Sequence, residues 1–221
     1  MSDYRTDFFT NVFTSRLWHS QESASGHGSD TVNTRNLVKE LPNLLHRLQV
    51  HSLLDVPCGD FNWMRDVALD GIEYIGGDIV PEIVAENSAN YARPGLRFEI
   101  IDLVKDDLPL VDMVFIRDCF LHFTNDLIVE ALQNIARSRI QYLCISHINT
   151  FSPWGGSGGK NIELERAVEG VNYEFRPLNF QLPPFNFPTP IDFVYDSGPG
   201  MSPEKIMAAW KVEDILTCLS N

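Results

Sequence analysis

Basic side chains are scarce in this sequence. Its 221 residues include 17 Lys and Arg against 30 Asp and Glu, which gives a formal net charge of −13. Proteins that bind nucleic acid without sequence preference depend on Lys and Arg to displace counterions from the phosphates. The acidic balance therefore argues against DNA or bulk RNA as a partner, while a basic protein or peptide stays open.

Long apolar runs and paired cysteines are also missing. The first 30 residues hold no apolar run behind a basic start, and nowhere do about 18 apolar residues follow one another. We therefore expect no signal peptide, no membrane span and a cytoplasmic location. The 4 cysteines lie far apart without a CxxC pair, so we expect reduced thiols rather than a zinc or thioredoxin-type site.

What is present has the composition of a globular protein, with 44% hydrophobic and 21% charged residues, and the length suits one domain over residues 1–221. Short apolar runs alternate with stretches of helical periodicity, the clearest of them at 81–92 and 125–137. This alternation predicts the α/β class with a doubly wound, mostly parallel sheet. Strands around 191–195 and 205–210 are expected to close the sheet with an antiparallel edge.

The chain divides into three expected parts: an N-terminal helix and loop over 1–34, a core with the binding site over 35–150, and substrate-side loops with closing strands over 151–221. Residues 1–18 show the spacing of an amphipathic helix. Residues 19–34 are polar and rich in Ser and Gly, so they form either a flexible linker or a mobile loop over a site. The residues that would belong to such a lid are Trp18, Ser25, Gly26, Gly28 and Ser29.

Acidic residues end the expected strands. Asp55, Asp78 and Asp102 each close an apolar run, and Asp118 follows Arg117 at the end of a fourth. An Asp at a strand end is also a common helix cap or turn former. Ligands of doubly wound sheets bind outside the carboxyl ends of the strands. A row of four carboxylates at that edge therefore predicts a binding site.

The turn after the first strand, DVPCGDF, contains one glycine, Gly59, which lets the backbone approach a ligand closely. The turn lacks the GxGxxG pattern that cradles a pyrophosphate, so a nicotinamide dinucleotide is a weak hypothesis. Asp78 lies 78 − 55 = 23 positions after Asp55. At this distance a βαβ unit places a carboxylate opposite the hydroxyls of a ribose.

The ordered set of motifs resembles the class I S-adenosylmethionine-dependent methyltransferases. SLLDVPCGD is similar to their first motif, YIGGDIV to the second, FEIIDLVKDDLP to the third and VDMVFIRDCFLHF to the fourth. The segments ESASGHGS and NFQLPPFNFP are similar to a bacterial subgroup of these proteins. Pro57 and Phe61 stand where the family usually has glycines, which leaves the detail of the first turn open.

The resemblance implies a Rossmann-like methyltransferase fold, with S-adenosyl-L-methionine as cofactor and S-adenosyl-L-homocysteine as product. It also assigns each cofactor contact to a residue of this chain. These are Asp55, Cys58, Gly59 and Asp60 for the methionine part, Asp78 for the ribose, Ile79, Asp102 and Leu103 for the adenine, and Arg117 or Asp118 for the methionine end and the methyl group.

Two histidines are placed to take a proton from a methyl acceptor, which is needed only where the attacking atom carries one. His122 lies four positions after Asp118, and His147 ends the fifth apolar run. With Asp118 they are the catalytic candidates, although a lone histidine is more often a packing residue. The same three residues and Asn149 could ligate a divalent ion, but this ligand set is too small, and we expect no metal.

We expect methyl transfer to an oxygen or nitrogen atom of a small molecule. The alternatives are a nicotinamide-dependent oxidoreductase and a noncatalytic module that binds S-adenosylmethionine. Aromatic residues late in the chain either line an acceptor pocket or pack in the core. These are Trp154, Phe175, Phe180, Phe185 and Phe187.

Overall fold

The structure, a computed structural model of the chain, describes residues 4–148, 161–198 and 205–218. It contains a seven-stranded sheet with the strand order β3-β2-β1-β4-β5-β7-β6. The strands are β1 (Ser52–Asp55), β2 (Glu73–Asp78), β3 (Leu96–Ile100), β4 (Met113–Ile116), β5 (Tyr142–Ile148), β6 (Asp192–Tyr195) and β7 (Lys205–Lys211). The helices are α1 (Tyr4–Ser15), α2 (Thr31–Arg47), α3 (Pro81–Tyr91), α4 (Asn125–Arg137) and the short α5 (Val212–Ile215).

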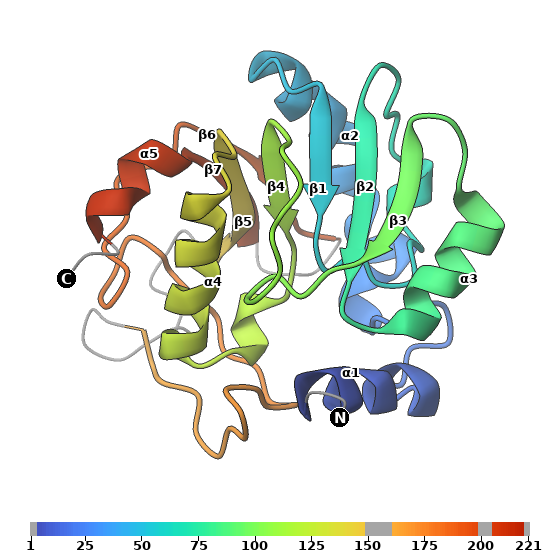
Figure 1. Cartoon of the computed structure of the whole chain (residues 1–221), viewed down its shortest axis with the longest axis horizontal. Coiled ribbons are helices and arrows are strands. Elements are labelled where there is room, and N and C mark those ends of the chain that lie inside the picture. The colour runs from blue at the N-terminus through green and yellow to red at the C-terminus, as the bar shows by residue number, and fades with distance from the viewer. Residues whose placement is uncertain (1–3, 149–160, 199–204, 219–221) are drawn as a thin grey trace.

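The sheet topology confirms the predicted fold class. Strands β1 to β5 pair in parallel, whereas β7 is antiparallel to both β5 and β6. The carboxyl ends of the parallel strands therefore meet at one edge of the sheet, the lower edge in Figure 1. All four runs that were expected to end in an acid reach that edge.

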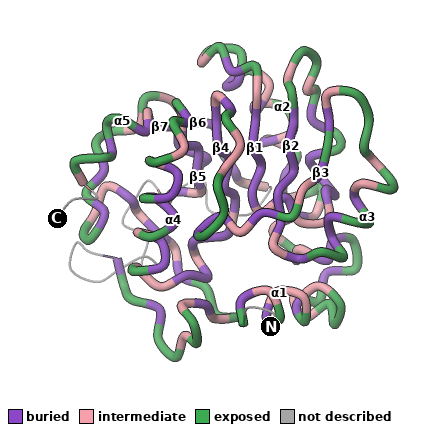
Figure 2. The backbone as a smooth tube through the Cα atoms, viewed as in Figure 1, coloured by how far each residue is buried: buried purple, intermediate pink, exposed green. Residues whose placement is uncertain are grey.

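The sheet is buried on both faces because neighbouring residues of each strand point in opposite directions. Leu54 of β1 packs in the cluster that contains Ile128 and Leu132 of α4. Leu53, the preceding residue, packs in the second cluster with Leu41 of α2 and Ile83 of α3. Figure 1 shows α4 in front of the sheet and α2 behind it, and in Figure 2 the central strands are buried along almost their whole length.

Helix α1 lies across the carboxyl edge of the sheet and contacts α3 (Figure 1). Phe8 and Val12 anchor the helix in the core, and the Phe8 ring lies 4.2 Å from the ring of Tyr173. The chain then turns at Arg16 (φ 47°) and His19 (φ 57°) into the loop of residues 19–30. No helix of the described residues is both long and apolar enough to span a bilayer.

Candidate active site

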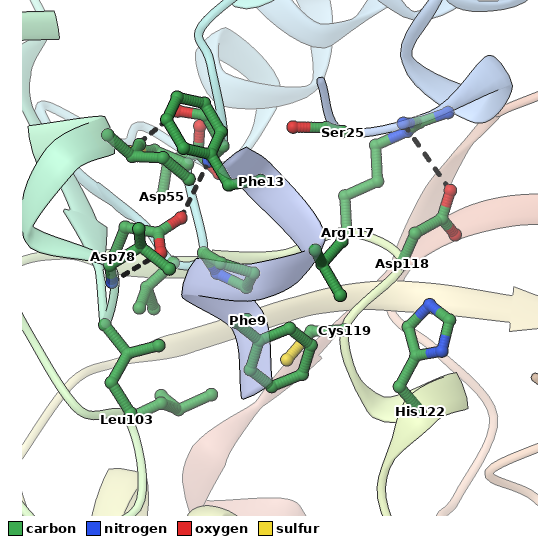
Figure 3. Close-up of a pocket in the computed structure, with 18 of the residues that line it drawn as sticks. Phe9, Phe13, Ser25, Asp55, Asp78, Leu103, Arg117, Asp118, Cys119 and His122 are labelled. Carbon is green, nitrogen blue, oxygen red and sulfur yellow. Dashed lines mark hydrogen bonds and ion pairs between the residues drawn. The ribbon is translucent and has the colours of Figure 1, made fainter. Parts of the chain in front are cut away.

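A cavity lies between the carboxyl ends of β1 to β4 on one side and α1 with the loop of residues 19–30 on the other (Figure 3). About 1070 Å³ of space lies between its walls, including the open solvent at its mouth. Most residues predicted for the site line this one cavity. They are Trp18, Ser25, Ser29, Asp55, Cys58, Gly59, Asp78, Ile79, Asp102, Leu103, Arg117, Asp118 and His122.

Asp55 ends β1 and is 3% exposed. The hydroxyl of Tyr74, on the neighbouring β2, donates a hydrogen bond of 2.6 Å to Oδ2 of Asp55. Burial raises the pKa of Asp55 to about 7, against the effect of this hydrogen bond, and the charge of Asp78 raises it further. The cavity therefore holds a carboxyl group that is costly to ionise, and the charge of Arg117 offsets only part of this cost.

Asp78 ends β2 and fixes the turn after β1. Its two oxygens accept hydrogen bonds of 3.0 Å from the backbone N–H groups of Gly59 and Val80. Burial raises its pKa to about 6, although these amide donors favour the ionised form. Gly59 has a φ of +55°, and a Cβ atom there would overlap with Oγ of Ser25. A side chain at this position would be strained by the left-handed backbone and would require the Ser25 hydroxyl to move.

Asp102, after β3, is held by a residue that the sequence analysis did not single out. Nη1 of Arg5, on α1, donates to its Oδ1 at 3.1 Å, and Nη2 donates to its Oδ2. The pair lines the cavity together with Phe9 and Phe13 of the same helix. Amphipathic spacing predicted α1 itself, but a spacing pattern does not reveal which surface the helix covers.

Asp60 does not line the cavity, in contrast to the role expected from the resemblance. Its carboxylate accepts hydrogen bonds from Oγ of Ser23 at 3.0 Å and from the backbone N–H of Ala24 at 2.6 Å. Nδ2 of Asn62 donates to the carbonyl of Ser29 at 3.0 Å and ties down the far end of the same loop. Asp60 and Asn62 thus hold residues 19–30 against the cavity.

Gly26 and Gly28, which were predicted as lid residues, do not line the cavity. Both make close contacts within the loop of residues 19–30 or with its neighbours. Gly26 has a φ of +87°, and a Cβ atom there would lie 2.9 Å from Cβ of Trp18. The carbonyl of Gly28 accepts a hydrogen bond of 2.8 Å from Nη2 of Arg117. Both glycines therefore shape the lid without facing the ligand space.

Four charged side chains meet at the end of β4, of which Arg117 and Asp196 are buried and Asp118 and Lys205 are half-buried. Arg117 donates from Nε and Nη2 to the two oxygens of Asp196 at 2.8 and 2.9 Å. Asp118 has a φ of +54° and accepts from Oγ of Ser146 at 3.0 Å and from Nζ of Lys205 at 2.6 Å. Burial opposes ionisation of Asp118, but Lys205 and Arg117 hold its pKa well below the usual range. Asp196 and Lys205 were not among the predicted site residues.

His122 faces the cavity below Asp118 (Figure 3). Its Nδ1 lies 3.2 Å from the carbonyl oxygens of Asn172 and Glu174. Because carbonyls only accept, Nδ1 carries the proton, and Nε2 of the neutral ring is left with its lone pair. The ring of Trp18 stacks on the imidazole at 5.2 Å, and burial lowers the pKa of His122. The arrangement keeps His122 neutral and able to accept a proton.

His147 lies outside this cavity, so its predicted catalytic role is not supported. It is 1% exposed, and its Nδ1 accepts a hydrogen bond of 3.2 Å from the backbone N–H of Phe180. Its ring packs against Phe180 and Trp210, and burial lowers its pKa to about 4. The physical reason is the side-chain alternation of β5, which turns His147 into the core next to the buried Phe180 and Trp210.

No group of three or more His, Cys, Asp or Glu is arranged to hold a metal ion within the described ranges. Asn149, which belonged to the metal group considered from the sequence, lies outside those ranges, as does Trp154. Phe175 is 72% exposed and its ring lies 6.4 Å from the ring of His122, so it is the one late phenylalanine of the predicted set that stays near the site.

No protein-family model and no curated protein matches the sequence. Among solved structures, an S-adenosylmethionine-dependent methyltransferase from Clostridium acetobutylicum matches with a TM-score of 0.54 and 12% identity, over 80% of this chain and 91% of that chain. Magnesium protoporphyrin IX methyltransferase from Synechocystis with bound SAH matches with a TM-score of 0.51 and 16% identity, over 66% of this chain and 72% of that chain. Human N-acetylserotonin methyltransferase with SAM matches with a TM-score of 0.47 and 16% identity, over 65% of this chain and 39% of that chain. The match therefore spans less than half of that protein.

Proposed function

We propose that this chain, which has the Rossmann-like fold of S-adenosylmethionine-dependent methyltransferases, binds that cofactor and transfers its methyl group to an oxygen or nitrogen atom of a small molecule. A shared fold does not by itself fix an activity, so the proposal depends on the chemistry of the cavity. The following contacts support it.

The observation that carries the proposal is the pair of buried carboxyl groups at the ends of β1 and β2. Asp55 and Asp78 are each 3% exposed, and neither forms an ion pair with a Lys or Arg of the described residues. Burial of an acid without a counter-charge is unfavourable, and a cationic ligand reverses that cost. S-adenosylmethionine carries two cationic groups, an ammonium and a sulfonium, and its ribose hydroxyls can donate to a carboxylate.

The other lining residues fit the remaining parts of the cofactor. Ile79 and Leu103 offer apolar surface at the ends of β2 and β3, where an adenine would lie, and Asp102 offers an acceptor for its amino group. On the other side of the cavity, His122 holds a lone pair on Nε2 for the proton of the acceptor. When bound, the cofactor supplies an electrophilic methyl group: the acceptor atom bonds to its carbon as the carbon–sulfur bond breaks, and the electron pair stays on sulfur.

Two features disfavour the nicotinamide-dependent oxidoreductase. A dinucleotide-binding sheet has six parallel strands in the order 3-2-1-4-5-6, whereas here β7 enters antiparallel between β5 and β6. The turn after β1 also has one glycine instead of the GxGxxG pattern.

The test is isothermal titration calorimetry with S-adenosylhomocysteine and, separately, with NADH. We expect the first to bind and the second not to bind. In Asp78→Ala the affinity for S-adenosylhomocysteine should fall by about tenfold or more, because one charge-assisted hydrogen bond contributes about 1.5 to 3 kcal/mol. Asp70→Ala, an exposed acid in the turn before β2, is the control and should bind like the natural protein. Absence of binding, or an unchanged affinity in Asp78→Ala, would refute the proposed cofactor site.

A further inference from the structure

The charges that line the cavity are distributed unevenly. Six of its lining side chains are carboxylates or guanidinium groups, and two of these, Asp55 and Asp78, have no ion-pair partner among the described residues. Both lie at the ends of β1 and β2, where the cofactor is proposed to bind. The unbalanced charge of the cavity is therefore negative and confined to the cofactor end. The six side chains are Arg5, Asp55, Asp78, Asp102, Arg117 and Asp118.

At the other end of the cavity, around His122, the charges cancel one another. Arg117 pairs with Asp196 at 2.8 Å, and Asp118 pairs with Lys205 at 2.6 Å. Each of these ions already has an opposite charge in direct contact, so it offers little to a charged ligand that would lose its own hydration on entry. A carboxylate, phosphate or ammonium group near His122 would find no unsatisfied counter-charge among the described residues.

The surfaces that remain at this end are aromatic and apolar. Trp18 stacks on His122, and Phe9, Cys119 and Phe123 complete the lining. Figure 3 shows Phe9, Cys119 and His122 around the space below Arg117. Aromatic faces favour flat rings in offset or edge-on contact. The polar group that His122 offers at this end is Nε2, whose lone pair can accept one proton.

We propose that the methyl acceptor is an uncharged aromatic molecule with a hydroxyl group, of the phenol class, whose ring lies against Trp18 and Phe9 and whose hydroxyl donates to Nε2 of His122. This assignment rests on the proposed function and narrows it. The hydroxyl proton moves to Nε2, the oxygen forms the new bond to the methyl carbon, and the electrons of the broken carbon–sulfur bond stay on sulfur. His122 returns its proton to water when the product leaves.

The test compares four probes of nearly the same size by isothermal titration calorimetry, with the protein saturated with S-adenosylhomocysteine. They are 2-naphthol, the anion 2-naphthoate, the cation 2-naphthylmethylammonium and the nonaromatic decahydro-2-naphthol. We expect 2-naphthol to bind about tenfold or more tightly than either ion, and more tightly than the nonaromatic alcohol. Equal or tighter binding of an ion, or no binding of 2-naphthol, would overturn the assignment.

The first titration separates the two proposals. If S-adenosylhomocysteine itself does not bind, the proposed function fails, and the probes then report on the cavity alone. If it binds while the probe order is wrong, the proposed function stands and the acceptor class is refuted.

A variant pair assigns the aromatic contact. Trp18→Leu keeps apolar bulk but removes the ring, and its affinity for 2-naphthol should fall by about fivefold or more while its affinity for S-adenosylhomocysteine changes little. Tyr195→Leu, which alters an aromatic side chain that is 51% exposed on β6, is the matched control. Equal loss in both variants, or no loss in Trp18→Leu, would remove Trp18 from the acceptor site.

Discussion

Replacement of Asp55 by Asn tests whether the cavity holds a carboxyl group whose ionisation destabilises the unliganded protein. Asn keeps the size of the side chain and an oxygen that can accept from Tyr74, but it cannot ionise. Burial raises the pKa of Asp55 from 3.8 to about 7. At 1.36 kcal/mol for each pKa unit, ionised Asp55 lowers the free energy of unfolding by about 4 kcal/mol.

The sign of the pH dependence follows from proton binding. Between pH 4 and about 7 the folded carboxyl keeps a proton that the unfolded chain has lost, so this group's contribution to stability falls as the pH rises and is constant above its folded pKa. In Asp55→Asn this decline is absent. The variant should therefore become more stable than the natural protein as the pH rises, by about 4 kcal/mol between pH 4 and pH 8.

Urea denaturation of both proteins at pH 4, 6 and 8 measures this difference. The quantity to compare is the change in their stability gap, because every other titrating group is common to both proteins. The same variant should bind S-adenosylmethionine less tightly at pH 8, since it lacks the negative charge that offsets the cationic ligand. A gap that stays constant with pH, to within about 1 kcal/mol, would refute the claim that Asp55 is a strained acid.

Two further variants test the base and the covering helix. His122→Ala should lower turnover by about a hundredfold while the calorimetric affinity for S-adenosylhomocysteine stays nearly the same, because a base acts in the transition state; equal turnover would end its assignment as the base. Arg5→Ala removes the ion pair between α1 and Asp102, and stopped-flow fluorescence should show S-adenosylhomocysteine dissociating about fivefold faster. The control is Arg35→Ala, which changes an exposed arginine on α2. An unchanged dissociation rate in Arg5→Ala would mean that the pair of Arg5 and Asp102 does not hold α1 over the cavity.

Much of the sheet and of the cofactor side could be predicted from the sequence because both depend on short-range patterns. An apolar run with an acid at its end locates a buried strand and its carboxyl end, and parallel strands place those ends together. For this reason Asp55, Asp78 and Asp102 were expected side by side, and the structure places all three on one cavity. The antiparallel closing strands followed from their β-like composition late in the chain.

The remainder depends on contacts between residues that are far apart in the sequence. Arg117 and Asp196 are 79 positions apart, and Arg5 and Asp102 are 97 apart, so no local pattern connects either pair. Asp60 lies outside the cavity lining because its carboxylate binds Ser23 and Ala24, which no local pattern reveals. His147 also lies outside the lining, because a strand end does not reveal which face of the sheet a side chain joins.

The position of Arg5 makes one carboxylate serve two partners. Asp102 pairs with Arg5 of α1. In the proposed function the same carboxylate also accepts a hydrogen bond from the adenine amino group. If the proposed adenine contact holds, cofactor binding and the packing of α1 both depend on the side chain of Asp102. Arg16 and His19, which both have a left-handed backbone, connect α1 to the loop of residues 19–30.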